Sequence, residues 1–330
     1  MSLVLDSLTK HFGAVTALDG VGFSVDRGEV FGFLGANGAG KTTAMRIVLG
    51  ILQADGGTVT WDGKPSTALP RRTWGYLPEE RGLYPRMEVL DQLVFFAALY
   101  GVPRHVGAER AREWLARFRI PEYEKRRAEE LSKGNQQKVQ FIAAILHDPP
   151  VLLMDEPFVG LDPVNVALLK EAFLEMRDRG KTLVFSTHQM ETVEELCESV
   201  ALLDHGRVVV SGPIRDVRRS TGRRVVRLGV AGDPDLPWLA ALGGVTVTRP
   251  GVDFTELDVD AGRDPESILL EAQAHGERIT RFEIGDPSIE QIFIERVGHA
   301  ASEDHRLAAP SGTPSPPPVG TLAAGTGAAR

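Results

Sequence analysis

The residues with the clearest chemical meaning lie in the stretch GANGAGKT, which fits the pattern G-x-x-x-x-G-K-[ST]. Glycines at such spacing let the backbone approach a ligand closely and aim N–H groups at phosphate oxygens. The Lys41 amine can reach the outer phosphates, and the Thr42 hydroxyl can bind Mg²⁺. We therefore predict a nucleoside triphosphate site made by Gly35, Ala36, Asn37, Gly38, Ala39, Gly40, Lys41, Thr42 and Thr43.

A pair of carboxylates follows the apolar run in LLMDEP. Phosphoryl chemistry needs one carboxylate for the Mg²⁺ shell and another group to orient or deprotonate the attacking water. Asp155 suits the first role and Glu156 the second, so both are candidate site residues.

A third candidate element is LSKGNQQK, which immediately precedes a helical pattern. Ser132 can cap that helix, and Ser132, Gly134 and the first free N–H groups can form a second surface for an anion. A simple N-cap is the alternative interpretation, and the position of the segment ahead of LLMDEP favours the functional one.

The elements that must position these residues read as a βαβ series. EVFGFLG predicts a strand that enters the loop, TAMRIVLGIL a helix that leaves it, and VLLMDEP a strand buried on both faces. Further strands, TLVFSTH and SVALLDHG, alternate with helices. The pattern predicts an α/β fold whose core sheet is mostly parallel with helices on both faces, so that the strand ends share one edge.

Other segments surround this core. Residues 3–30 predict a small antiparallel β layer, and about 80–147 a helical subdomain. The alternation of strands and helices ends at about Gly212, and residues 223–297 predict an accessory α+β domain with two helices. The tail at 300–330, rich in Pro, Gly and Ala, is predicted to be disordered.

Composition narrows the classes of function. The 330-residue chain has a net charge of −8, which argues against a general nucleic-acid binder. No apolar run is long enough to span a bilayer, and the N-terminus does not resemble a signal peptide. Together with a single cysteine, these features predict a cytoplasmic location.

The ordered motifs GANGAGKT, LSKGN, LLMDEP, GLDP and STH resemble those of ATP-binding-cassette (ABC) transporter ATPases over roughly residues 3–220. The resemblance implies a P-loop NTPase fold for residues 1–220, with ATP and Mg²⁺ as ligands. It implies that ATP lies between two subunits packed head to tail, the second being another copy or a paralogue. Ser132 and Gly134 would then act in trans, Asp162 would belong to the D-loop, and His188 would contact the γ-phosphate.

Two further residues match family positions with a changed side chain. Phe12 stands where the family usually has a tyrosine that stacks on adenine. Glu79 replaces the Q-loop glutamine, and its carboxylate can still bind Mg²⁺ or water. The signature carries Lys133 and Asn135 in place of the usual Gly and Gln.

Within the family, PEERGLYP, LSKGNQQK and the end PSIEQIFIERVG resemble NatA-like and drug-resistance exporter ATPases. Such subunits pair with a separately encoded membrane permease, which implies a peripheral place on the inner face of the membrane. Sodium and antibiotics are among the cargoes that this resemblance allows. A cassette ATPase acting on ribosomes or DNA is the alternative hypothesis, and a metabolic P-loop kinase a third, which LSKGN and His188 oppose.

Overall fold

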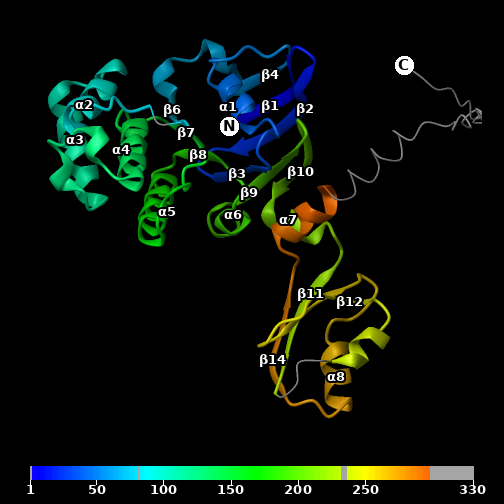
Figure 1. The fold of residues 1–330 in the computed structure, drawn as a ribbon. Helices are drawn as coiled ribbons and strands as arrows, with labels where there is room; N and C mark the ends of the chain where they lie inside the picture. The colour runs from blue at the N-terminus through cyan, green and yellow to red at the C-terminus, as the bar shows by residue number, and fades with distance from the viewer. Residues whose placement is uncertain (1, 81, 232–235, 298–330) are drawn as a thin grey trace, which may run out of the picture.

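The computed structural model describes residues 2–80, 82–231 and 236–297, arranged as a larger body and a smaller C-terminal unit (Figure 1). The predicted disordered tail lies outside the described residues. No helix in the described part of the chain combines the length and the apolar character needed to cross a membrane.

A six-stranded sheet forms the centre of the larger body, in the order β10-β9-β3-β8-β7-β6. Strands β6, β7, β8, β3 and β9 pair in parallel, and β10 is antiparallel to β9. The predicted α/β class with a mostly parallel core sheet is confirmed. The strands are β3 (Val30–Gly35), β6 (Trp74–Leu77), β7 (Val151–Asp155), β8 (Thr182–Thr187), β9 (Ser199–Asp204) and β10 (Arg207–Pro213).

A second sheet, with the order β2-β1-β4-β5, is antiparallel throughout and confirms the predicted N-terminal β layer. Asp62 and Gly63 both have positive φ, 51° and 74°, as a two-residue hairpin turn between β4 and β5 requires. The strands are β1 (Ser2–Phe12), β2 (Val15–Asp26), β4 (Gly56–Trp61) and β5 (Lys64–Pro65).

Helices cover the central sheet and form the predicted helical subdomain at one end (Figure 1). Those along the sheet are α1 (Lys41–Val48), α5 (Pro163–Asp178), α6 (Met190–Leu196) and α7 (Ile214–Arg219). The subdomain contains α2 (Val89–Leu99), α3 (Arg104–Arg117) and α4 (Lys133–Ile145). Short 3₁₀ helices occupy Ser66–Ala68, Arg71–Thr73, Pro121–Tyr123, Ala128–Glu130 and Pro237–Ala241.

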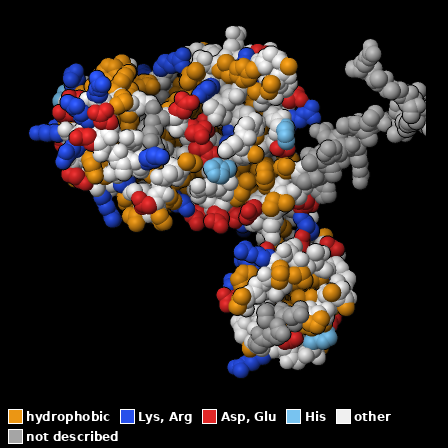
Figure 2. All heavy atoms as spheres, viewed as in Figure 1, with side chains coloured by type: hydrophobic (Ala, Val, Ile, Leu, Met, Phe, Trp, Pro, Cys, Tyr) orange, Lys and Arg blue, Asp and Glu red, His pale blue; other side chains and the backbone are white. Residues whose placement is uncertain are grey.

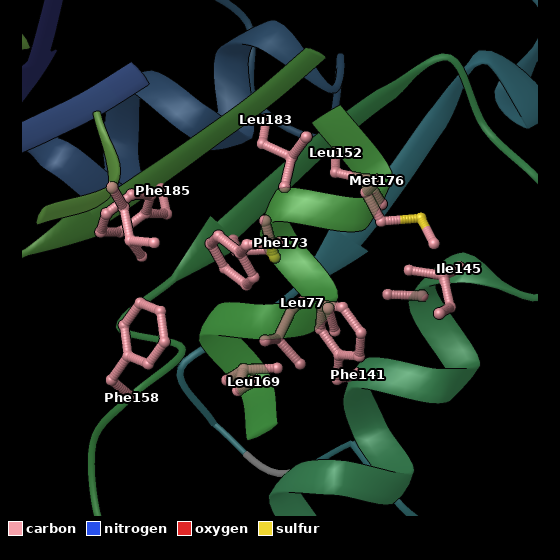
Figure 3. Packing of buried hydrophobic residues seen from close by; sticks show 14 of the residues in the cluster. Leu77, Phe141, Ile145, Leu152, Phe158, Leu169, Phe173, Met176, Leu183 and Phe185 are labelled. Atoms are coloured by element: carbon pink, nitrogen blue, oxygen red, sulfur yellow. The ribbon is translucent and has the colours of Figure 1, made fainter. Parts of the chain in front are cut away.

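Buried aromatic rings join α4 to α5 and both to the sheet (Figure 3). Phe141 of α4 stacks on Phe173 of α5 with ring centroids 5.9 Å apart, and Phe173 meets Phe185 of β8 at 5.5 Å. Aromatic contacts of this kind add to the free energy of burial. They hold the two helices in a fixed relation to the sheet.

The C-terminal unit is an antiparallel sheet, β12-β13-β11-β14, packed on α8. Its elements are β11 (Arg224–Val230), β12 (Val245–Arg249), β13 (Thr255–Val259), α8 (Ser267–Ala274) and β14 (Ile279–Gly285). The second predicted helix, residues 289–297, returns to the larger body beside α7 (Figure 1). Its Ile289 and Ile292 join the core cluster of that body, and the Ile289 N–H donates to Glu194 of α6.

Candidate functional site

The glycine-rich loop connects the carboxyl end of β3 to the start of α1. Gly40 has a φ of 108°, and a Cβ at this position would lie 2.5 Å from the Ala17 carbonyl oxygen. Only glycine allows this conformation and this close approach. Lys41 is buried, and its Nζ donates to the carbonyl oxygens of Gly35, at 2.7 Å, and Ala36, at 3.2 Å. The amine is therefore held across the mouth of the loop.

Asp155, at the carboxyl end of β7, is 1% exposed and accepts two hydroxyl hydrogen bonds. The Thr42 hydroxyl donates to Asp155 Oδ2 at 2.6 Å, and the Ser186 hydroxyl donates to Oδ1. The parallel register of β7 and β8 places Ser186 opposite Asp155. The strand ends thus bring a carboxylate and two hydroxyls to the first turn of α1.

Glu156 adopts a left-handed backbone conformation, with a φ of 48°, in which its N–H donates to Ser186 Oγ at 3.1 Å. Non-glycine residues rarely take this conformation, and it turns the side chain back toward the loop. Its Oε1 lies 3.8 Å from Lys41 Nζ and 3.0 Å from His188 Nδ1. Its Oε2 is buried and has no hydrogen-bond partner within the described residues.

Electrostatics at Lys41 reflect its enclosed position. Burial lowers the pKa of Lys41, and the nearby carboxylates of Glu156, Asp155 and Glu79 oppose that shift. A buried ammonium is a strong partner for an incoming anion, because little water must be displaced from it, and Mg²⁺ would offset the repulsion between the anion and the carboxylates.

These residues line one cleft of about 320 Å³. Its walls are Ala17, Asn37, Gly38, Gly40, Lys41, Thr42, Thr43, Glu79, Asp155 and Glu156. The structure therefore brings the predicted loop, both carboxylates and Glu79 to a single site. His188, with its side chain 50% exposed, contacts that site through Glu156.

The remaining predicted residues form a second group at the N-terminal ends of α4 and α5. Ser132 caps α4 by accepting from the Asn135 N–H at 3.3 Å, and Asp162 caps α5 by accepting from the Val164 and Asn165 N–H groups. The Asn165 N–H is the largest cause of a lowered pKa at Asp162.

Gly134 connects the two caps. A Cβ added to it would lie 3.5 Å from Asn165 Nδ2, which itself donates to the Asp162 carboxylate. Ser132, Gly134 and Asp162 lie outside the lining of the cleft. In the described chain, therefore, the cleft and this second group are separate surfaces of one subunit.

Phe12, at the end of β1, is the most isolated of the predicted residues. Its ring is 50% exposed, and Lys10 Nζ lies 5.6 Å from the ring centroid. The ring is free to stack on a flat ligand, and it is not part of the cleft lining.

Sequence reasoning did not select Ala17, which lines the cleft, or Ser186, which lies behind it and donates to Asp155. The signal for Ser186 was available, because it ends a strand predicted to lie parallel to VLLMDEP. No local signal marks Ala17, which the antiparallel layer brings to the loop from a distant part of the chain.

Comparison with known proteins agrees with this arrangement. Residues 18–159 match the ABC transporter family, and residues 212–297 match the C-terminal domain of DrrA1-3-like ATP-binding proteins. The chain is 45% identical over 296 residues to the ABC transporter ATP-binding protein YhaQ of Bacillus subtilis, covering 90% of this chain and 98% of that protein. It is 33% identical over 304 residues to the Nod factor export ATP-binding protein I of Ralstonia nicotianae, with 90% and 94% coverage. A solved ATP-binding subunit of an ABC transporter superposes with a TM-score of 0.63 at 33% identity, covering 67% of this chain and 94% of that one.

Proposed function

The chain belongs to the ATP-binding subunits of the ABC transporter family, and from this premise we propose that it hydrolyses ATP to drive a separately encoded exporter permease. The observation that carries the proposal is the meeting of Lys41, Thr42, Asp155 and Glu156 in one cleft. Export is supported by the relative that is named for Nod factor export.

The cleft supplies the groups that ATP requires. The loop N–H groups and Lys41 bind the phosphates, because the amine now bonded to backbone carbonyls can exchange them for phosphate oxygens. Glu156 accepts a proton from the attacking water, for which its unpartnered Oε2 is available, and His188 orients that carboxylate. Phe12 stacks on adenine.

The hydroxyl and carboxylate oxygens of Thr42 and Asp155 fit Mg²⁺, and Glu79 lines the same cleft. The described chain has no group of three or more His, Cys, Asp or Glu side chains able to hold a metal ion. Mg²⁺ would therefore be bound together with the phosphates of ATP, as is usual for this ion. When bound, it neutralises charge on the phosphoryl group.

The residues at the N-terminal ends of α4 and α5 complete the nucleotide site of a neighbouring subunit. Ser132 and Gly134 would meet the ATP held by the cleft of a second copy or a paralogue, with Asp162 beside them. Val159 and Val164, on either side of Asp162, are 45% and 61% exposed, which suits a surface covered on dimerisation.

A groove between α2 and α4 is the surface that we assign to the permease. It has a volume of about 210 Å³ and includes Leu83, Phe96 and Tyr100. Tyr84 and Leu99 nearby are 51% and 65% exposed, so an apolar helix end could be buried there. This contact would hold the subunit on the inner face of the membrane.

Nucleic acid is not expected as a partner. The net charge is −8, and Figure 2 shows Lys and Arg side chains interspersed with acidic ones on the face in view. Phosphate-backbone binding requires a concentrated basic surface.

Trapping the dimer tests the proposal. The variant Glu156→Gln should elute as a dimer from a size-exclusion column in saturating ATP and Mg²⁺, because it binds ATP and hydrolyses it poorly. A monomer under these conditions would contradict the shared site.

Gly134→Asp in the same background is the matched control. A Cβ at Gly134 meets its neighbours at ordinary contact distances, so the fold should tolerate the change. The added carboxylate would face the partner's ATP and should return the protein to a monomer. Co-purification with a membrane permease would then test the proposed partner.

A further inference from the structure

Gln140, in the middle of α4, contacts the backbone on both sides of Glu79. Its side chain is 4% exposed, and its Nε2 donates to the Pro78 carbonyl oxygen at 2.9 Å and to that of Glu80 at 3.1 Å. Since both neighbours are carbonyl oxygens, only the NH₂ end of the amide can face them. Two hydrogen bonds, one on each side of Glu79, therefore hold the loop that carries this residue.

This side chain lies between the two surfaces assigned above. Glu79 lines the nucleotide cleft, whereas Gln140 lines the groove between α2 and α4 together with Pro78 and Phe96. Gln140 is thus a direct link between α4 and the cleft wall that carries Glu79.

The amide of Gln140 makes two hydrogen bonds but also carries a cost to stability. The Oε1 of Gln140 is buried and has no hydrogen-bond partner within the described chain. An unpaired buried acceptor destabilises a fold, and an apolar side chain of similar size would avoid that cost. An apolar side chain, however, could not donate hydrogen bonds to the carbonyl oxygens of Pro78 and Glu80.

We propose that Gln140 is a positioning residue for Glu79. By holding the carbonyl groups of Pro78 and Glu80, the residues on either side of Glu79, it keeps the Glu79 carboxylate directed into the cleft, where it interacts with the Mg²⁺ shell. The inference rests on the proposed function, because it concerns the same nucleotide site.

The variant Gln140→Leu tests the inference in the full chain. ATP binding is measured by calorimetry at increasing Mg²⁺ concentration, and thermal unfolding is followed in parallel. We expect the Mg²⁺ concentration for half-maximal ATP binding to rise about tenfold, as is usual when a group behind a metal ligand is removed. The loss of two hydrogen bonds should lower the unfolding temperature, which should stay above the temperature of the titration.

Lys138→Met is the matched control. Lys138 lies on the same helix, is similarly buried, and donates to the Phe118 carbonyl oxygen at 3.0 Å, away from the cleft. We expect it to leave the Mg²⁺ dependence within about twofold of the parent chain.

Repeating Gln140→Leu in a Glu79→Ala background separates positioning from general damage. If Gln140 acts through Glu79, the substitution should change the Mg²⁺ dependence less than about twofold there. An equal change in both backgrounds, or an unchanged Mg²⁺ dependence in the parent background, would overturn this inference alone. Absence of ATP binding by the parent chain would instead overturn the proposed function, and this inference with it.

Discussion

Replacing Thr42 with valine probes the structural and the ligand-binding role of one hydroxyl. Valine has nearly the same shape as threonine but lacks the hydroxyl, so Thr42→Val removes the hydrogen bond to Asp155. Asp155 is 1% exposed and would keep only the Ser186 hydroxyl as a side-chain donor. The substitution therefore leaves a buried carboxylate oxygen without its partner.

The expected loss can be worked out from this geometry. A hydrogen bond to a charged group contributes roughly 1.5–3 kcal/mol, and at 2.6 Å to a buried carboxylate we take about 2 kcal/mol. For a body of this size each kcal/mol shifts the midpoint by about 2–4 °C, so Thr42→Val should unfold about 4–8 °C below the parent chain.

The assay is thermal unfolding with and without MgATP. Ligand binding stabilises the folded state by mass action, so a tenfold weaker affinity removes about 1.4 kcal/mol of that stabilisation. Thr42→Val should lose this amount or more in addition to its loss without ligand. Thr42→Ser is the control, because it keeps the hydroxyl and loses one methyl group, for about 0.8 kcal/mol.

Two results would refute the reasoning. If Thr42→Val unfolds at the parent temperature without nucleotide, the hydrogen bond to Asp155 does not stabilise the fold. If Thr42→Ser is as impaired as Thr42→Val in both conditions, packing of the methyl group and not the hydroxyl explains the effect.

Three further predictions concern the loop, the β layer and the C-terminal unit. Gly40→Ala should weaken ATP binding far more than Gly38→Ala. Both residues have positive φ, but only Gly40 lies against the Ala17 carbonyl. Equal losses of ATP affinity in a binding titration would contradict this steric reason. Hydrogen bonds from Lys10 and a backbone N–H lower the pKa of Asp55 to about 2. The contribution of Asp55 to stability is therefore present above pH 3.8 and is lost as the pH falls toward 2. A carbon-13 NMR titration of Asp55 with a midpoint near pH 3.8 would disprove this. Ile292→Ala should destabilise the packing of helix 289–297 on the larger body by about 2–4 kcal/mol, and unchanged limited proteolysis near this helix would argue against that contact.

Much of the architecture could be predicted because its signals are local. The apolar run before Asp155 and the loop before Lys41 each combine a strand with a turn or helix in one short segment. The confirmed α/β class and parallel core sheet follow from such units, since strands joined by helices pair in parallel. The ABC family assignment is also confirmed, through motifs that carry their chemistry within a few residues.

Other features could not be predicted, because they depend on which distant segments meet. The approach of Ala17 to Gly40 comes from packing the antiparallel layer on the central sheet. The return of helix 289–297 to α6 joins residues about a hundred positions apart, and its apolar pattern shows only that one face is buried, not against what.

The sequence by itself determined the chemistry of the loop, because Lys41 and Thr42 follow the glycines at a spacing that the local backbone turns into a phosphate site. The tertiary structure alone decided that Asp155 lies within hydrogen-bond distance of Thr42, and that the Gln140 amide of α4 donates to the backbone next to Glu79. The physical reason is range: backbone conformation depends on neighbouring residues, whereas the position of a side chain relative to a distant segment depends on how whole strands and helices pack.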